Sequence, residues 1–342
     1  MKFLLTAINA KFIHSNPAIY SLRAGVGEKL QPYVELAEFT INESLESILE
    51  GIWKRQPKVI GFSCYIWNWK LIREILTELP KILPDTEIWL GGPEVTYDGP
   101  GLLREFPQVT GIMVGEGEVT FREVLEQYLR EAETAGQSEQ QPESDSTEHQ
   151  VADRRGTVAG KSMVERFGQI PGLCLASGYT APRDLTDLTT LPFLYEDMEP
   201  FTNRIIYYET SRGCPYRCSY CLSSIDKKVR LRDISVVKRE LQFFLDQNVK
   251  QVKFIDRTFN CDHKHAMEIW RYIYEHDNGV TNFHFEISAD ILREEEIALL
   301  NRFRPGLAQL EIGVQSTNPE TIRAIHRVMD VDKLEKIVAA IH

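Results

Sequence analysis

The N-terminal part of the chain alternates short apolar runs with segments whose apolar residues recur every three or four positions. The apolar runs predict β-strands at residues 2–9, 34–41, 58–66, 87–92 and 111–117. The periodic segments predict helices at residues 17–30, 43–54, 68–83 and 119–133. Strands that are apolar almost throughout and alternate with helices are typical of a parallel sheet covered on both faces. We therefore expect an α/β domain with a Rossmann-like, flavodoxin-like parallel sheet over residues 1–131.

The same alternation returns in the C-terminal part. Apolar runs predict strands at residues 204–210, 251–256, 282–287 and 307–314. Periodic segments predict helices at residues 233–248, 263–276, 293–303, 318–329 and 331–342. In the first of these helices Asp233 stands at the N-cap position, and the buried face is marked by Val237, Leu241, Phe244 and Leu245. Residues 205–342 thus predict four β/α units of a second parallel domain.

Two segments between these parts lack either pattern. Residues 132–168 are polar, poor in large apolar side chains and without periodicity, so they cannot bury enough surface to order themselves. We interpret them as a flexible linker or surface insertion. Residues 169–204 contain four prolines and predict an irregular connector.

A length of 342 residues suits two domains, and the composition is that of a globular protein. The net charge of −11 argues against non-specific electrostatic binding of nucleic acid, because such binding needs a basic surface. KKVRLR, at residues 227–232, is a candidate local basic patch or else a solvated helix entrance. No apolar run approaches the ~20 residues that span a bilayer. With six cysteines and no signal-peptide pattern, we expect a cytoplasmic protein with reduced thiols.

Three of the six cysteines crowd into one stretch, ETSRGCPYRCSYCLSS, at residues 209–224. Cys214, Cys218 and Cys221 follow a predicted strand, so they belong to a loop at its carboxyl end, where parallel β/α folds build their sites. Three thiolates that converge from one loop can bind a metal centre. The spacing therefore makes this loop the leading candidate site.

Two kinds of metal centre fit such a loop. A structural zinc ion needs four ligands, and Cys261 or His263 after the next strand would have to supply the fourth. An iron–sulfur cluster is usually held by four thiolates; with three, one iron stays open to a ligand from outside the protein. Arg212 and Arg217 would balance the negative charge of such a cluster. The remaining alternative is that the three cysteines are incidental.

GCPYRCSYC, with the aromatic Tyr220 just before the last cysteine, resembles the signature of radical S-adenosylmethionine (SAM) enzymes. The resemblance implies that Cys214, Cys218 and Cys221 hold a 4Fe–4S cluster whose open iron binds the amino and carboxylate groups of S-adenosylmethionine. One electron, from a donor such as flavodoxin or ferredoxin, then splits this cofactor, and a 5′-deoxyadenosyl radical abstracts hydrogen from a substrate. Since a full barrel of this family is expected to have six β/α units, four units imply a partial radical SAM barrel. We expect a truncated chain; the alternative is an unusually short protein.

Further residues match cofactor-binding positions of this family one by one. Asp256, at the end of the second strand of this domain, resembles the acidic position that takes the methionine amino group. Glu286, Gln315 and Arg327 are similar to positions that hold the ribose hydroxyls and the carboxylate in the coproporphyrinogen-dehydrogenase type of radical enzyme. Asp290 lies at the same strand end as Glu286. An ordinary surface ion pair or hydrogen bond is the alternative for each of them.

The N-terminal domain offers its own candidate site, because open α/β sheets bind ligands beyond the carboxyl ends of their strands. Ser63 follows the third strand, Gly91 and Gly92 the fourth, and Gly115 and Gly117 the fifth. This arrangement, ahead of a radical loop, resembles the cobalamin-binding domain of one large class of radical SAM enzymes. In that class the serine and the Gly-Gly pair line a slot for the nucleotide tail of cobalamin.

One cobalamin motif is missing. Asp-x-His-x-x-Gly, which supplies a lower cobalt ligand in many cobalamin proteins, is absent from the chain. His14 lies in KFIHSNP without that aspartate or glycine, and packing within its loop is the alternative role for it. We therefore expect cobalamin without a histidine lower ligand; the alternative is a domain that has lost the cofactor.

These resemblances imply a cobalamin-dependent radical SAM enzyme, with methyl transfer to an unactivated carbon as one outcome of its chemistry. One alternative is a radical enzyme that modifies RNA in the manner of a methylthiotransferase. Another is a non-catalytic metal-binding module or an inactive fragment. We expect no membrane contact, and the acidic charge disfavours nucleic acid as a partner. The sequence names no substrate.

Overall fold

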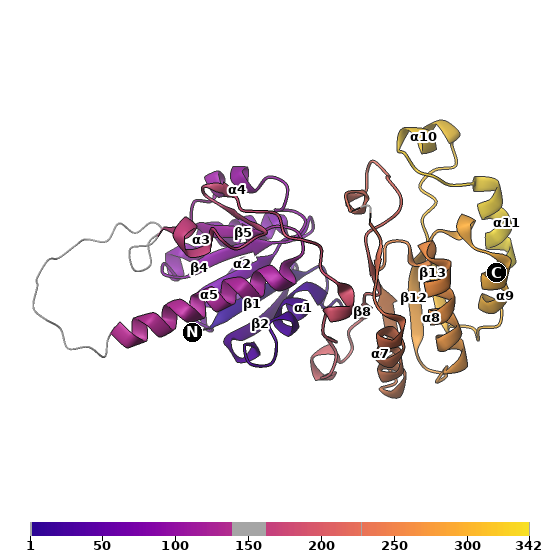
Figure 1. Ribbon diagram of the computed structural model, residues 1–342, viewed down its shortest axis with the longest axis horizontal. Coiled ribbons are helices and arrows are strands. Elements are labelled where there is room, and N and C mark those ends of the chain that lie inside the picture. Colours follow the sequence, from indigo (N-terminus) through magenta and orange to yellow (C-terminus); the bar gives the residue numbers. More distant parts are fainter. Residues whose placement is uncertain (1, 139–161, 227, 342) are drawn as a thin grey trace, which may run out of the picture. The chain divides into compact units, whose positions relative to one another are not determined.

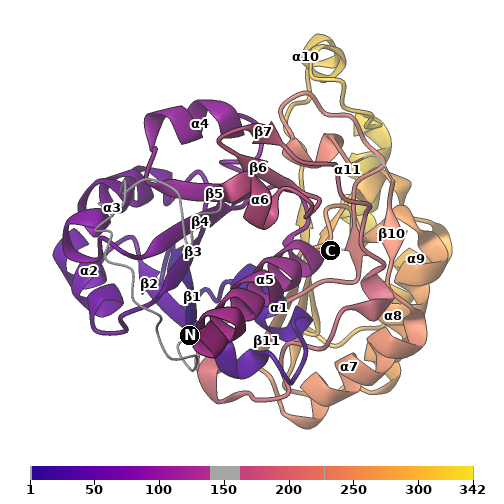
Figure 2. The same ribbon diagram turned by 60° about the vertical axis from the view of Figure 1, so that its left-hand side comes forward.

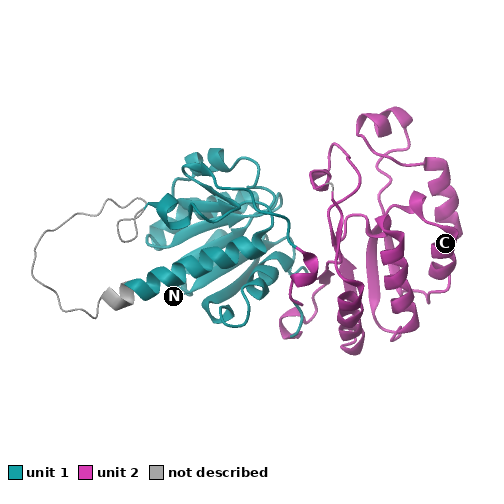
Figure 3. Cartoon of the chain, viewed as in Figure 1, with its two compact units in different colours: residues 1–186, 194–196 teal, residues 187–193, 197–342 magenta. Residues whose placement is uncertain are grey.

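The computed structural model describes residues 2–138, 162–226 and 228–341. The chain divides into two compact units, drawn in two colours in Figure 3. Unit 1 comprises residues 1–186 and 194–196, and unit 2 comprises residues 187–193 and 197–342. Each unit is built around its own parallel sheet (Figure 1). Among the described residues, no helix is both long and apolar enough to cross a bilayer.

Unit 1 contains five parallel strands in the order β2-β1-β3-β4-β5. They are β1 (Phe3–Asn9), β2 (Val34–Thr40), β3 (Val59–Ser63), β4 (Glu87–Gly91) and β5 (Val109–Met113). The helices that follow them in turn are α1 (Pro17–Gly25), α2 (Leu45–Trp53), α3 (Trp69–Ile82), α4 (Gly99–Glu105) and α5 (Gly117–Ser138). This strand order is that of the flavodoxin-like doubly wound fold, so the predicted fold class is confirmed. The sequence pattern did not predict α4, which is short and begins with Gly-Pro-Gly.

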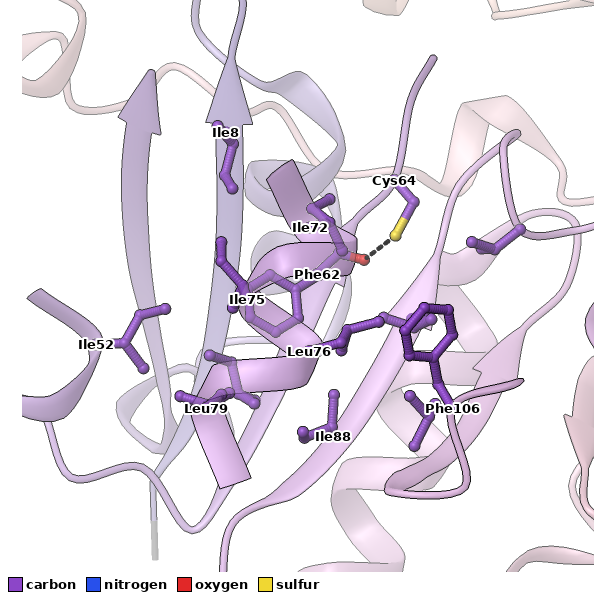
Figure 4. Close-up of a cluster of buried hydrophobic side chains, with 14 of the residues drawn as sticks. Ile8, Ile52, Phe62, Cys64, Ile72, Ile75, Leu76, Leu79, Ile88 and Phe106 are labelled. Atoms are coloured by element: carbon purple, nitrogen blue, oxygen red, sulfur yellow. Dashed lines mark hydrogen bonds between the residues drawn. The ribbon is translucent and has the colours of Figure 1, made fainter. Parts of the chain in front are cut away.

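Helices cover both faces of this sheet, which explains why its strands are apolar almost throughout (Figure 2). All seven residues of β1 are buried, and they point alternately into two cores. On one face Ile8 and Phe62 pack with Ile72 of α3 (Figure 4). On the other face Phe3 meets Phe121 of α5 edge to face, with ring centroids 4.9 Å apart. Apolar burial on both sides is therefore the main term that stabilises this unit.

Cys64 lies in the first of these cores. Its thiol donates to the carbonyl oxygen of Phe62 at 3.5 Å (Figure 4). Burial raises the pKa of this thiol far above its ordinary value. A buried and protonated thiol is inert, so Cys64 has a packing role.

Residues 173–179 are more ordered than the predicted irregular connector. β6 (Leu173–Leu175) pairs antiparallel with β5, and β7 (Gly178–Tyr179) pairs antiparallel with β6, so the first sheet is extended by two strands. The prediction is wrong here because strands of three and two residues are too short for periodicity to reveal them. The predicted linker at residues 132–168 falls largely on residues 139–161, which lie outside the described residues.

The end of that predicted linker is folded as well, in helix α6 (Met163–Phe167). The Arg166 side chain is 1% exposed and binds Glu87 of β4 (3.1 Å) and Glu131 of α5 (2.8 Å). This buried guanidinium, held by two carboxylates, joins α6 to the sheet and to α5. Replacing Arg166 by a neutral residue, or both glutamates by neutral residues, would leave a buried charge without a partner.

Unit 2 contains four parallel strands in the order β13-β12-β11-β8. They are β8 (Ile206–Tyr208), β11 (Gln251–Phe254), β12 (Asn282–Ile287) and β13 (Ala308–Ile312). Their helices are α7 (Ile234–Asp246), α8 (His263–Glu275), α9 (Glu294–Leu300), α10 (Pro319–Ala324) and α11 (Val331–Ile341). These are the four predicted β/α units, so the partial barrel is confirmed. Asp233 caps α7 by accepting from the Ser235 amide (2.8 Å), and the predicted apolar face of α7 is buried.

Apolar and polar residues alternate along the strands of unit 2. In β12, Phe283 and Phe285 are buried, and Phe285 lies edge to face on Trp270 of α8. His284 and Glu286, between and after them, are only partly buried. Because successive side chains of a strand point to opposite faces, one face of this sheet packs on helices and the other, inner face is polar.

The arginines of KKVRLR are engaged in ion pairs. Arg230 binds Asp226 at 3.0 Å. Arg232 is buried, and its guanidinium binds Glu240 at 2.7 Å. Lys227 lies outside the described residues. Since both arginines are neutralised within the protein, they do not form the basic patch that is one of the two alternatives for this segment.

Candidate functional site

The three cysteines lie in the loop that leaves the carboxyl end of β8. A two-stranded ribbon closes the loop at its base, where β9 (Ser211–Arg212) pairs antiparallel with β10 (Arg230–Leu231). Cys214 and Cys218 are 8% and 6% exposed, and Cys221 is partly exposed. The structure therefore places them where the sequence indicated, on a loop beyond a strand's carboxyl end.

Gly213 lets this loop turn tightly just before the first cysteine. Its φ of +93° is in the region that favours glycine, and a Cβ atom there would lie 2.5 Å from the carbonyl oxygen of Lys228. Further along, the Cys214 amide donates to the carbonyl oxygen of Asp226 at 3.2 Å. Backbone hydrogen bonds thus fold the loop around its cysteines.

Asp256, just beyond the carboxyl end of β11, fastens the start of the cysteine loop. Its carboxylate accepts hydrogen bonds from the Thr210 amide (3.1 Å), the Thr210 hydroxyl (2.7 Å) and the Ser211 hydroxyl (2.5 Å). Asp256 is 1% exposed, and burial raises its pKa to about 6. This differs from the predicted contact with a methionine amino group, because protein donors enclose the carboxylate. Asp256 is better placed to position the cysteine loop than to touch a ligand.

Further hydrogen bonds join the loops beyond the other strands. Asn260, fully buried after β11, exchanges two hydrogen bonds with the backbone of Ser288 after β12 (2.9 and 3.0 Å). The Tyr216 hydroxyl, in the cysteine loop, donates to the Ser288 hydroxyl (3.4 Å), and the Ser219 amide donates to the carbonyl oxygen of Ile325 after α10 (2.9 Å). The four loops at this edge are thus tied together. Sequence reasoning missed Asn260, whose only signal is a small polar residue close behind a strand.

Cys261 and His263, the two candidates for a fourth zinc ligand, are not placed to complete a zinc site with the three cysteines. His263 Nδ1 lies 2.9 Å from Oε1 of the buried Glu296. Burial, and then the nearby Cys214, raise the pKa of the Cys261 thiol to about 11. Within the described ranges, no three His, Cys, Asp or Glu side chains lie close enough together to ligate one metal ion. These residues therefore do not form a ready site for a single zinc ion.

The donor set of the loop suits an iron–sulfur cluster better. In a cubane cluster each thiolate binds a different iron atom, so three cysteines can stand further apart than the ligands of a single ion. Cys214, Cys218 and Cys221 would hold three of the four irons, and the loop itself offers no fourth thiolate. The fourth iron would then be open to a ligand from outside the protein.

Arg327 and Gln315 converge beside the cysteine loop, from the segment that follows β13. A Cβ atom on Gly313 would lie 2.9 Å from Gln315 Nε2 and 3.7 Å from Arg327 Nη2, so both side chains close over that glycine. The Arg327 guanidinium donates to the Gly313 carbonyl oxygen and to the Tyr220 hydroxyl (3.4 Å). Its Nε is buried and has no hydrogen-bond partner in the described structure. An arginine with an unsatisfied buried donor fits an anionic ligand such as a carboxylate.

Glu286 lies on β12, on the inner face of the unit 2 sheet. It stands opposite Glu311 in the strand register, and the Nζ atom of Lys253 lies 3.9 Å from Glu286 and 3.0 Å from Glu311. Burial raises the pKa of Glu286 above its ordinary value. Asp290 is different: it is buried and accepts hydrogen bonds from neighbouring protein groups, so its role is structural.

In unit 1 the candidate small residues gather at the carboxyl ends of three neighbouring strands. Ser63 ends β3 and lies opposite Gly91, which ends β4 and in turn lies opposite Met113 of β5. The Asn16 side-chain amide donates to the Ser63 hydroxyl (3.2 Å), which links the loop after β1 to this edge. A Cβ atom on Gly91 would meet Met113 at an ordinary 3.8 Å. The protein's own packing therefore does not require a glycine at 91, and the position leaves room for a ligand.

The three other candidate glycines of this edge differ in why a glycine stands at their position. Gly92 has a φ of +109°, and a Cβ atom there would lie 2.5 Å from the carbonyl oxygen of Cys64. Gly117 begins α5, and a Cβ atom there would lie 3.0 Å from a leucine side chain of α1. Gly115 has a φ of +78°, and a Cβ atom added there would have no described atom of another residue within 4 Å. Gly92 and Gly117 thus serve close packing, whereas Gly91 and Gly115 leave space at the strand ends.

His14 lies in the loop after β1, at the same edge of the sheet. Its backbone is held at both ends: the amide donates to the carbonyl oxygen of Lys11 (3.1 Å), and its carbonyl oxygen accepts from the Asn9 side chain (3.1 Å). These bonds fix the loop itself. The expected absence of a histidine ligand to cobalt stays a prediction.

Two family models match the chain. Residues 4–125 match the B12 binding domain, and residues 208–342 match the Radical SAM superfamily. The B12-binding range covers the five parallel strands of unit 1, except for Phe3 at the start of β1. The radical SAM range covers the cysteine loop and three of the four strands of unit 2 in full.

Known proteins resemble the chain over most of its length. The 2-(S-pantetheinyl)-carbapenam-3-carboxylate methyltransferase of Streptantibioticus cattleyicolor is 28% identical over 64% of this chain and 29% of its own length. The anaerobic magnesium-protoporphyrin IX monomethyl ester cyclase of Rubrivivax gelatinosus is 21% identical over 86% of this chain and 50% of its own. The radical S-adenosylmethionine methyltransferase TsrM of Kitasatospora setae, solved with cobalamin and a [4Fe-4S] cluster, has a TM-score of 0.67 at 17% identity, over 99% of this chain and 65% of TsrM. The chain thus spans less than two thirds of each of these proteins.

Proposed function

Because the chain belongs to the radical SAM superfamily and carries a B12-binding domain ahead of its radical domain, we propose that it is a cobalamin-dependent radical SAM enzyme. The family predicted from the cysteine loop is confirmed by these matches. For the reaction, we propose methyl transfer to an unactivated carbon. The carbapenam enzyme and TsrM, which are similar to this chain, are methyltransferases.

One observation carries this proposal: three cysteines share a loop at the carboxyl end of β8, two of them buried, without a fourth thiolate in the loop. We propose that Cys214, Cys218 and Cys221 hold a 4Fe–4S cluster. When bound there, the cluster supplies the electron that cleaves S-adenosylmethionine into a hydrogen-abstracting radical. The protein's part is to hold the loop in shape, which Asp256 and Asn260 do, and to keep water from it.

S-adenosylmethionine would be held by residues beyond β12 and β13. The unsatisfied Nε of Arg327 can donate to the methionine carboxylate. Glu286 and the side-chain oxygen of Gln315 can accept from the ribose hydroxyls. We leave Asp256 out of this set, since its carboxylate is enclosed.

Cobalamin would lie at the carboxyl edge of the unit 1 sheet. Ser63 offers a hydroxyl there, and Gly91 and Gly115 leave space for a group that approaches the backbone. When bound, cobalamin supplies the carrier of the methyl group. We propose that no histidine of this chain binds cobalt from below.

The two adjacent glycines of unit 1 should respond differently to alanine. Gly92→Ala should destabilise unit 1 by at least about 2 kcal/mol, because its positive φ disfavours other residues and the new Cβ atom would meet Cys64. Gly91→Ala should leave the free energy of unfolding within about 0.5 kcal/mol yet weaken cobalamin binding at least about tenfold, or 1.4 kcal/mol. Urea unfolding and cobalamin titration would measure the two effects. If Gly91→Ala binds cobalamin as well as wild type, Gly91 does not line the site.

The proposal as a whole has a direct test on the wild-type chain. After anaerobic reconstitution, the protein should be brown and contain about four irons per chain, retain added cobalamin, and release 5′-deoxyadenosine from S-adenosylmethionine under a reductant. A colourless protein that binds zinc instead would overturn the proposal. A brown protein that releases no 5′-deoxyadenosine would be a cluster-binding module without this activity.

The chemistry also implies a partner and a compartment. We propose a low-potential flavin or iron–sulfur protein as the electron donor. All six cysteines are free in the structure, which agrees with a reducing cytosol. We do not propose RNA as the substrate, because the chain is acidic overall and Arg230 and Arg232 are already paired.

A further inference from the structure

A cationic hollow lies beside the cysteine loop, and the proposed chemistry uses little of it. Its volume is about 630 Å³. The residues that line it come from the cysteine loop and from the end of α10; they include Pro215, Arg217, Arg323, His326, Arg327 and Val328. We call this hollow and its rim the loop-side basic surface. Among its cations, Arg327 belongs to the proposed cofactor-binding set and Arg217 is expected to balance the charge of the cluster. Arg323 and His326 have neither role.

The charges of this surface are not neutralised by the protein itself. Arg217 and Arg323 are exposed, and neither forms an ion pair with any carboxylate of the described residues. Other arginines of the same region behave differently: Arg212, Arg230 and Arg232 each bind a carboxylate. In a chain with a net charge of −11, an unpaired cluster of positive charge is a local exception. Such a cluster attracts an anionic partner.

Apolar side chains lie among these cations. Val328 is 70% exposed and Tyr220 is 52% exposed, with the Tyr220 hydroxyl beside the Arg327 guanidinium at 3.4 Å. The hydrogen bond from the Ser219 amide to Ile325 holds this part of the loop against the end of α10. Exposed apolar side chains with a charged rim, on a held backbone, are typical of a protein-docking surface.

The position of this surface relates it to the cluster. Arg217 stands in the chain between Cys214 and Cys218, so a partner that covers Arg217 lies against the loop of the proposed cluster ligands. A protein that delivers an electron to the cluster must come this close.

We propose that the loop-side basic surface docks an acidic one-electron carrier protein, which reduces the cluster there. This inference rests on the proposed function. In the step itself the reduced carrier loses one electron and the cluster gains it, with no bond made or broken. Charge complementarity selects such a partner, accelerates its association and makes the rate fall with added salt. An RNA partner is less well matched, because the other arginines of the region are paired and the chain as a whole is acidic.

The test reverses one charge of the surface and one matched charge elsewhere. Arg323→Glu changes an exposed residue that lies outside the proposed cofactor-binding set. The control, Lys250→Glu, changes an exposed residue just before β11, at the opposite edge of the same sheet. Cluster reduction is followed by stopped-flow absorbance, once with a purified, reduced flavodoxin as the acidic carrier and once with dithionite. Iron content and dithionite reduction report whether each variant is folded and loaded.

We expect the flavodoxin-driven rate at low ionic strength to fall at least about tenfold in Arg323→Glu, to return in Arg323→Lys and to stay unchanged in Lys250→Glu. Rates with dithionite should agree within about twofold for all variants, since a small reductant needs no docking surface. Equal flavodoxin rates in wild type and Arg323→Glu would overturn this surface while leaving the proposed function in place. A chain that holds no cluster would overturn both. If Arg323→Glu instead lost only the binding of a single-stranded RNA oligonucleotide, the surface would belong to nucleic acid and this proposal would be wrong.

Discussion

Replacing Cys214 with alanine should remove almost all iron from the protein, whereas replacing Cys261 should remove none. Without Cys214 the loop keeps only two thiolates, and two do not hold a cubane cluster. We expect iron to fall from about four atoms per chain to less than about one, with loss of the brown absorbance. Cys214 lies close enough to Cys261 to help raise the pKa of the Cys261 thiol, yet Cys261 is not one of the proposed ligands. Iron analysis of both variants after anaerobic reconstitution measures the effect.

This pair of variants separates the two metal centres that the sequence left open. In a zinc site completed by Cys261, both variants would lose metal, and the metal lost would be zinc. Circular dichroism of each variant shows whether a loss of iron reflects unfolding. If Cys214→Ala held as much iron as wild type, the cysteine loop would not be the cluster site.

Removing the Asp256 carboxylate should destabilise unit 2 and loosen the cysteine loop. Asp256→Ala leaves three buried donors of Thr210 and Ser211 without their acceptor. At about 1–3 kcal/mol for each of the three unsatisfied donors, we expect a loss of about 3–9 kcal/mol in the free energy of unfolding. Urea unfolding measures this loss, and the rate at which a chelator strips iron reports the looser loop. Unchanged values of both would show that the loop is held by other contacts.

Asp256→Asn separates the charge of this residue from its shape. Burial raises the Asp256 pKa from 3.8 to about 6, so the folded protein binds this proton more tightly than the unfolded chain does. Its contribution to stability is therefore largest below about pH 4 and falls as the pH rises to about 6, by up to about 3 kcal/mol for a shift of about two units. The asparagine variant lacks this dependence.

The measurement is the difference in unfolding free energy between wild type and Asp256→Asn, taken on cluster-free protein from about pH 4 to about pH 7. The advantage of wild type over the variant should shrink across that range. Other titrating groups are common to both proteins and cancel in the difference. A difference that stays constant with pH would show that Asp256 is ionised throughout.

Much of the fold was predictable from the sequence because apolar periodicity records burial. All seven residues of β1 are buried, and α7 buries the apolar face that its spacing predicts, behind the Asp233 cap. The cysteine loop was predictable because three thiols within a short stretch after a strand are typical of a metal centre. Periodicity failed where elements are very short, as in β6, β7 and α4.

The roles of single side chains were less predictable, because they depend on residues far away in the chain. Asp256 looks like a ligand-binding carboxylate until Thr210, 46 positions earlier, is seen to donate to it. Gly91 and Gly92 are indistinguishable by type, but only Gly92 has a positive φ and a backbone oxygen against its Cβ position. Arg230 and Arg232 look like a basic patch until their carboxylate partners are known.

The alternation of buried and polar residues in β12 affects which of its positions can change in sequence while the fold is kept. Phe283 and Phe285 hold the sheet on its helices, while His284 and Glu286 face the other way. Substitutions on the inner face of this strand therefore need not disturb the residues that keep it folded, although Glu286 there belongs to the proposed cofactor-binding set. β1 offers no comparable freedom, since each of its residues is packed. Between these two strands, sequence change that preserves the fold is therefore expected at the inner-face positions of β12 rather than in β1.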